Sequence, residues 1–310
     1  MFIAYMDRRD FIKVSGAAAA GLALSGYAPR SWSKREEDLF GPKKTGHFSL
    51  TQLSSVTDTI GNSYLLKTAG GKVIMMDGGY ASELPKLRKY LAEAGNHVDL
   101  WFISHPHEDH MEALATILQD PQGVTIDKVI YSRVQDEVLD HEPVSAENAR
   151  RYYRALDNTP ARTDFLNLHQ PFQRFDIDGI GILVIGVDHP GFESKSYNNQ
   201  STIIRVWDDT KSVVFLGDAE EECGNAALKE CREYLDCDYL QMAHHGQNGV
   251  SEEFYKTVNF RACLWPTSSW VWEPGEERTW LKTYDTRRWM EEKGITEHHV
   301  SCLEEDWTLL

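Results

Sequence analysis

Three histidines and one aspartate fall within six residues of each other in the segment 103–112, which reads ISHPHEDHME. His105 and His107 are two residues apart in an extended stretch, so their side chains are expected to point to the same side. Asp109 and His110 follow at the expected start of a helix. Imidazole and carboxylate groups are ligands for zinc, manganese and iron. Because histidine is uncommon and the spacing is specific, the segment predicts a metal site rather than a polar loop with chance histidines.

Further candidate ligands follow later apolar segments, at the expected ends of strands. Asp218 comes after an apolar run and before a helix, where it could bridge two metal ions or simply cap the helix. His244 and His245 are adjacent, so only one of them can readily point inward, and His245, next to a glycine, is the preferred ligand. His189 also stands at a strand end, with an ordinary loop residue as the alternative.

Asp77 opens an Asp-Gly-Gly sequence directly after the apolar run 73–76. An aspartate at this point could hold a ligand histidine through the ring nitrogen that does not face the metal. The alternative is a simple turn built from aspartate and glycine.

Positioning these residues requires several strands that end at one edge, and the hydrophobic periodicity predicts them. Strands are expected over 62–68, 72–76, 98–103, 128–131, 172–177, 180–185, 201–207, 212–216, 239–243 and 262–265. Helices are expected over 82–94, 112–118, 146–156, 219–234 and 279–293. Two β-rich halves with helices and no linker between them predict one α/β sandwich over residues 47–310.

Composition narrows the function classes. The 310 residues are 41% hydrophobic, which is enough for a real core and excludes wholesale disorder. The net charge of −16 repels phosphate backbones, so nonspecific nucleic-acid binding is disfavoured. An odd number of cysteines, none in a C-x-x-C pair, excludes a disulfide framework and a structural zinc site; the cysteines are Cys223, Cys231, Cys237, Cys263 and Cys302.

The N-terminus has the pattern of a bacterial export signal. Arg8 and Arg9 precede a weakly apolar stretch over 14–24, which is typical of a twin-arginine signal and too short for a permanent membrane span. The alternative is a basic arm beside a small buried helix. We therefore expect residues 1–28 to be the signal, residues 29–46 a linker, and the mature protein to be periplasmic or extracellular.

The ordered set of motifs resembles the metallo-β-lactamase superfamily over residues 47–310. The motifs are Asp77-Gly-Gly, His105-x-His107-x-Asp109-His110, Asp218 and His245. The segments 104–110, 198–201, 216–220 and 244–246 are similar to the branch that includes the hydrolase domain of DNA-uptake competence proteins and the phosphorylcholine esterases.

The resemblance implies a four-layer αββα fold with one or two metal ions, most often zinc, at one edge of the sandwich; manganese or iron are alternatives. By this similarity, the first metal is held by His105, His107 and His189, and the second by Asp109, His110 and His245. Asp218 would bridge the two. If His189 is not a ligand, the first site has one protein ligand fewer. β-Lactam hydrolysis is not expected, because the main β-lactamases of the superfamily usually replace one of the equivalents of His110 or Asp218.

A metal ion that acidifies water at such a site would make the protein a hydrolase, with Asp109 or Asp218 orienting the nucleophile. A phosphoester or related ester of a small or surface-attached molecule is the expected substrate, since two cations neutralise its developing charge. One alternative is an extracellular nuclease, which the acidic composition disfavours. The other is a metal-binding protein of the same fold without catalysis. Patterns in the sequence do not specify the oligomeric state.

Overall fold

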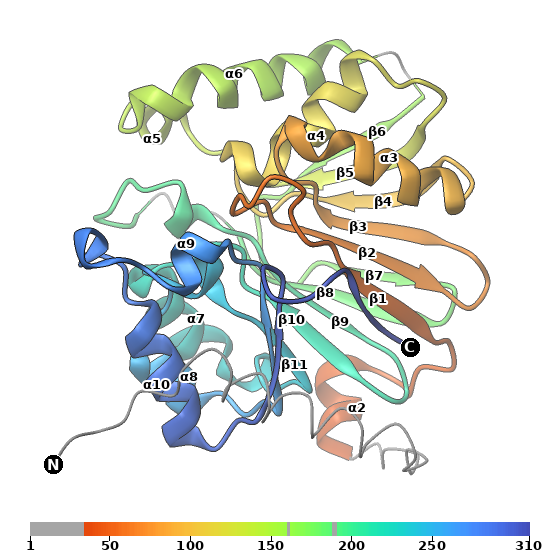
Figure 1. The fold of residues 1–310 in the computed structure, drawn as a ribbon. Coiled ribbons are helices and arrows are strands. Elements are labelled where there is room, and N and C mark those ends of the chain that lie inside the picture. The colour runs from red at the N-terminus through yellow and green to blue at the C-terminus, as the bar shows by residue number, and fades with distance from the viewer. Residues whose placement is uncertain (1–33, 160–161, 188–190) are drawn as a thin grey trace, which may run out of the picture.

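The computed structural model describes residues 34–159, 162–187 and 191–310. The expected export signal and His189 lie outside these residues. Two seven-stranded sheets face each other, and helices cover the outer face of each sheet (Figure 1). This is the expected four-layer arrangement.

The first sheet places the carboxyl ends of its central strands at one edge. Its order is β14 (Trp307–Leu309), β1 (Phe48–Gln52), β2 (Ser63–Thr68), β3 (Val73–Asp77), β4 (His97–Phe102), β5 (Thr125–Tyr131) and β6 (Asp164–Asn167). From β3 to β6 the pairs are parallel, with Met75 opposite Trp101. Asp77 therefore lies beside the loop that follows β4.

The second sheet repeats this arrangement. Its order is β13 (Glu297–Val300), β12 (Ala262–Trp265), β11 (Tyr239–Gln241), β10 (Ser212–Phe215), β9 (Ile203–Trp207), β8 (Ile180–Gly186) and β7 (Arg174–Ile177). The pairs from β10 to β13 are parallel, with Val214 opposite Leu240. The segments after β10 and β11 consequently leave the sheet at the same edge.

Helices form the two outer layers (Figure 1). The first sheet is covered by α3 (Leu84–Glu93), α4 (Glu108–Gln119), α5 (Asp136–Leu139) and α6 (Pro143–Asn158). The second is covered by α7 (Glu221–Cys231), α8 (Glu252–Thr257), α9 (Ser269–Trp272) and α10 (Thr283–Lys293). Among the described residues, no helix is long and apolar enough to cross a membrane.

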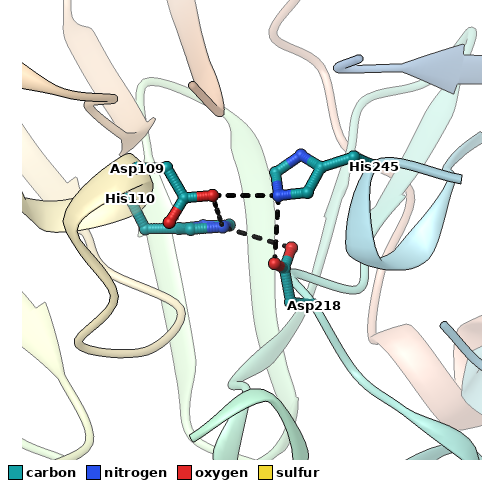
Figure 2. A group of neighbouring side chains, drawn as sticks. All are labelled: Asp109, His110, Asp218 and His245. Carbon is teal, nitrogen blue, oxygen red and sulfur yellow. Dashed lines mark ion pairs between the residues drawn. The ribbon is translucent and has the colours of Figure 1, made fainter. Parts of the chain in front are cut away.

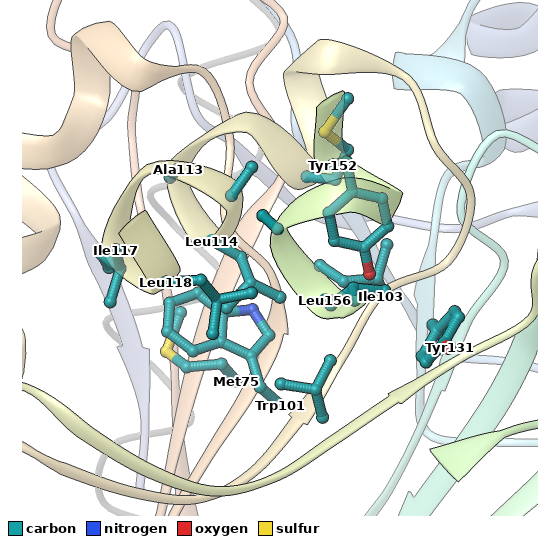
Figure 3. Packing of buried hydrophobic residues seen from close by; sticks show 14 of the residues in the cluster. Met75, Trp101, Ile103, Ala113, Leu114, Ile117, Leu118, Tyr131, Tyr152 and Leu156 are labelled. Atoms are coloured by element: carbon teal, nitrogen blue, oxygen red, sulfur yellow. The ribbon is translucent and has the colours of Figure 1, made fainter. Parts of the chain in front are cut away.

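Alternation along the strands explains the layers. In β3, Val73 and Met75 pack under the helices, while Ile74 and Met76 face the second sheet. Side chains of α4, including Leu114, pack over Trp101 of β4 (Figure 3). Strands that are buried on both faces have near-continuous apolar runs, which is why they could be predicted from the sequence.

Part of the expected linker contacts the sandwich. Residues 34–40 form α2 (Lys34–Phe40), and the ring centroid of buried Phe40 is 5.4 Å from that of Trp207. The division of the chain at residue 47 stays a prediction.

Candidate metal centre

Four buried side chains from three segments converge at the edge where the two sheets open (Figure 2). Asp109 and His110 lie in the first turn of α4, after β4. Asp218 follows β10, and His245 follows β11 within the 3₁₀ turn η4 (Ala243–Gly246). Each carboxylate or imidazole offers one atom to a group whose members all lie within 4.8 Å of one another.

The distances within this group are short. His245 Nε2 is 3.0 Å from Asp109 Oδ2 and 3.1 Å from Asp218 Oδ2. His110 Nε2 is 3.1 Å from Asp218 Oδ1 and 3.5 Å from Asp109 Oδ2. Each carboxylate therefore approaches both imidazoles.

The nitrogen and oxygen atoms of this group are arranged for binding a cation rather than for hydrogen bonds with one another. Despite the short distances, His110 Nε2, His245 Nε2 and Asp218 Oδ1 are buried and have no partner with hydrogen-bond geometry among the described residues. Buried polar atoms are nearly always hydrogen-bonded, so three such atoms directed at one point need another ligand. Two imidazole nitrogens and two carboxylates suit a divalent cation such as zinc, manganese or iron.

The remaining nitrogen of each imidazole is held by the protein. His110 Nδ1 is 2.7 Å from Asp77 Oδ2, and Asp77 also accepts hydrogen bonds from the backbone N–H of Ser104 and the side chain of Asn62 at 2.7 Å each. His245 Nδ1 donates to the carbonyl of Pro266 at 2.8 Å. These contacts turn both Nε2 atoms toward the centre, and the role of Asp77 in holding a metal-ligand histidine stays a prediction.

Unusual backbone geometry brings the second-sheet residues into place. His244 and His245 have φ values of 51° and 59°, and Gly217, just before Asp218, has a φ of 56°. A Cβ on Gly217 would lie 2.8 Å from the Cβ of Ser104. Left-handed conformations are costly for residues other than glycine and are concentrated at functional sites.

His105 and His107 lie beside this group and face the position that the resemblance implies for the first metal. His105 Nε2 is 2.9 Å from His107 Nδ1 and 4.0 Å from Asp218 Oδ2, so Asp218 stands between the two positions. Within the described residues, this first position is approached by two imidazoles and one carboxylate. His189, the further ligand implied by the resemblance, lies outside those residues.

His244 also turns toward the site, but at a longer distance. Its Nε2 is 4.0 Å from Asp218 Oδ2 and 3.3 Å from Asn198 Nδ2, and its Nδ1 is 3.8 Å from Glu220 Oε1. The shorter contacts of His245 agree with the preference for His245 as the ligand, which stays a prediction.

The buried carboxylates and imidazoles of the site shift one another's pKa values. Burial opposes a charge on each imidazole, but the Asp218 and Asp109 carboxylates raise the pKa of His245 to about 9 and the pKa of His110 well above its usual value. Burial raises the pKa of Asp109 and Asp218, yet the two imidazoles outweigh it, so both carboxyl pKa values fall below the usual range. Burial and the neighbouring His110 lower the pKa of His105.

Sequence reasoning missed polar residues in contact with the site, among them Asn62, which donates to Asp77, and Glu142. Glu142, just before α6, places Oε2 2.7 Å from His107 Nε2. A single glutamate, 35 positions away along the chain, has no spacing that could have indicated this contact.

The family model of the metallo-beta-lactamase superfamily matches residues 56–257, and a model of the twin-arginine translocation signal sequence matches residues 6–25. No curated protein matches the chain.

Solved structures share the fold at low sequence identity. The metallo-beta-lactamase fold protein YhfI from Bacillus subtilis is 15% identical with a TM-score of 0.52, covering 84% of this chain and 99% of its own. CmlA, a diiron beta-hydroxylase from Streptomyces venezuelae, is 14% identical with a TM-score of 0.53, covering 98% of this chain and 60% of its own. At these identities the likeness shows the fold alone.

Proposed function

The chain belongs to the metallo-beta-lactamase superfamily and carries a twin-arginine signal that indicates export from the bacterial cytoplasm; from this premise we propose that it is a metal-dependent hydrolase of phosphoester or related ester bonds. The observation that carries the proposal is the buried group of Asp109, His110, Asp218 and His245, in which three atoms that could bind a metal have no hydrogen-bond partner within residues 34–159, 162–187 and 191–310. Its substrate would be a small or surface-attached ester, since the net charge of −16 disfavours the binding of nucleic acid.

Zinc is the proposed metal, with manganese or iron as alternatives, because the donors are imidazole and carboxylate without thiolate. Asp109, His110 and His245 would hold one ion, and His105 and His107 the other, with Asp218 between them. The chemistry that a divalent cation supplies here is the acidification of water and the neutralisation of developing negative charge.

The protein's own residues would orient this chemistry. Asp77 holds His110, and the Pro266 carbonyl holds His245, so that both rings keep a lone pair directed at the centre. Asp109 or Asp218 would accept the hydrogen bond of the attacking water and so orient its lone pair toward the substrate. Burial of both carboxylates excludes bulk solvent and strengthens these interactions.

The test combines elemental analysis with a broad ester screen. Purified protein loaded with zinc or manganese should hydrolyse bis-p-nitrophenyl phosphate, and Asp218→Ala should lower this rate by on the order of 10³-fold, because several kcal/mol of charge stabilisation depend on the metal. Asp164→Asn, an exposed carboxylate paired with Lys128, is the matched control and should keep full activity. Metal-loaded protein that turns over no phosphoester, lactone or thioester would refute the proposal and favour a metal-binding protein without catalysis.

A further inference from the structure

The imidazole ring of His107 contacts two residues that lie outside both sheets, Glu142 at its edge and Tyr197 on one face. Its Nε2 lies 2.7 Å from Glu142 Oε2, and its ring stacks on that of Tyr197, with centroids 5.1 Å apart and an interplanar angle of 29°. Its Nδ1 is 2.9 Å from His105 Nε2. The two ring nitrogens thus face different environments, a carboxylate on one side and the first metal position on the other.

Glu142 is itself fixed by the residue that stacks on His107. The backbone N–H of Tyr197 donates to Glu142 Oε1 at 2.7 Å, so both carboxylate oxygens have a partner. Tyr197 is fully buried, and its hydroxyl donates to the carbonyl of Leu139 at 2.8 Å. The carboxylate, the aromatic ring and the helix α5 therefore form one unit around the imidazole.

We propose that Glu142 is a positioning residue that fixes the tautomer and orientation of His107 and thereby sets the affinity of the first metal position, without holding a metal itself. The inference rests on the proposed function of the site. It adds a residue on the helical layer that neither the motif nor the strand ends indicated.

The chemistry of imidazole supports this role. A neutral imidazole carries its proton on one nitrogen and its lone pair on the other, and an ionised carboxylate can only accept a hydrogen bond. Glu142 therefore selects the tautomer with the proton on Nε2, which leaves the lone pair of His107 on Nδ1, the atom that faces His105. Hydrogen-bond partners behind a ligand imidazole typically change metal affinity by about 10–100-fold.

The first position is the one where such support matters most. Among the described residues, it is approached by His105, His107 and Asp218, whereas the second is approached by Asp109, His110, His245 and the same Asp218. Because the first position has fewer ligands among these residues than the second, losing one well-oriented imidazole there removes a larger share of the free energy of metal binding.

Stepwise zinc affinity, measured by competition with a chromophoric chelator, tests the proposal without relying on turnover. Glu142→Ala should weaken the first position by about 10–100-fold and leave the second unchanged. Glu142→Gln should have a smaller effect, since its single acceptor oxygen cannot serve both His107 and Tyr197. The matched control is Glu147→Ala, in the helix α6 that follows Glu142 and paired with Arg154 at 2.7 Å, which should match the wild type.

A double-mutant cycle separates positioning from general destabilisation. His107→Ala should lose the first ion, and adding Glu142→Ala should cause no further loss, because Glu142 acts through His107. Additive losses, or a Glu142→Gln protein that binds both ions as the wild type does, would overturn the inference while leaving the hydrolase proposal intact. A wild type with a single ion that His107→Ala does not affect would also overturn it. A wild type that takes up no metal would refute the proposed function as well.

Discussion

Each imidazole of the centre has one nitrogen facing the site and the other held by a group of the protein. Asp77 holds His110, the Pro266 carbonyl holds His245, and Glu142 contacts His107. The free protein thus already orients the lone pairs that a cation needs. Pre-orientation reduces the ordering cost of binding, but the Asp109 and Asp218 carboxylates also favour protonated imidazoles, so metal and proton compete for the same nitrogens.

This competition makes metal binding depend on pH. The Asp218 and Asp109 carboxylates raise the pKa of His245 to about 9 and that of His110 well above its usual value, so protons compete with a cation for both rings near pH 7. Zinc must displace these protons. The affinity should therefore rise with pH, by about tenfold per pH unit for each proton displaced, and level off once pH exceeds the pKa values.

Calorimetry of zinc binding in buffers with different ionisation enthalpies measures the number of protons that the protein releases. At pH 7, zinc uptake should release at least one proton from His245 and His110 together. An affinity that is flat between pH 6 and pH 8, with no proton release, would show that the imidazoles are neutral before the metal arrives.

Most of the residues at the site could be predicted because their chemistry is concentrated in short motifs. His105, His107, Asp109 and His110 lie in one segment, and Asp77 precedes two glycines. Glu142 could not be predicted, since its contact depends on how the helical layer packs over the loop after β4. The positive φ of His244 and His245 was also unpredictable, because only a small fraction of histidines adopt that region and nothing in the sequence distinguishes these two.

At the scale of elements, the centre depends on where strands end. Asp218 is delivered by a turn after β10 in which Gly217 has a φ of 56° and approaches Ser104 closely. Ser104 directly precedes His105 in the loop after β4. The turn at Gly217 therefore brings the segment with Asp218 into contact with the segment that contains the histidine motif. Gly217 has no side chain to separate them.

Gly217→Ala should therefore weaken zinc binding by roughly tenfold or more, because the new methyl group would push Asp218 away from the histidines. It should also lower the free energy of unfolding by more than the 1–2 kcal/mol or so that a left-handed alanine costs. Gly294→Ala is the matched control, since Gly294 has a φ of 78° at the end of α10 and no atom within 4 Å of the added Cβ.

Chelator competition and urea unfolding of the two variants distinguish the effects. Gly294→Ala should lose stability alone and keep the wild-type zinc affinity. Equal zinc affinities in both variants would mean that the close approach of Gly217 to Ser104 does not position Asp218.

Elements were predictable where burial on both faces gives long apolar runs, as in β4 and β8. Of the four strands at sheet edges, β7 was predicted and β6, β13 and β14 were missed, as was β1 inside the first sheet. β13 has the sequence EHHV, and β14 is three residues long, so neither has an apolar run. β14 is held by tertiary contact, with Trp307 stacked on His299 at a centroid distance of 3.6 Å. The helix α4 begins at Glu108, four residues before the range that hydrophobic periodicity indicated, because Asp109 and His110 of the motif lie in its first turn.

At the scale of the whole molecule, the two sheets contribute different side chains to one candidate metal centre. Asp109 and His110 follow the first sheet, and Asp218 and His245 follow the second. Between the sheets, side chains such as Ile74 and Ile204 form a shared apolar layer, but at the open edge polar groups take their place. At that edge the two sheets approach each other through the imidazoles of His110 and His245 and the carboxylates of Asp109 and Asp218.

A metal ion should therefore stabilise both sheets together. A ligand that binds only the folded state raises the free energy of unfolding by about 4 kcal/mol when its free concentration is one thousand times its Kd. We therefore expect zinc to raise Tm by several degrees. Hydrogen exchange should slow in parallel at the start of α4 and in η4, because one ion joins them. Asp218→Ala should abolish most of the Tm shift, while Asp164→Asn should keep it. If zinc protected the α4 segment and left η4 unchanged, the ion would be held by the first sheet alone, and a centre shared between the two sheets would be wrong.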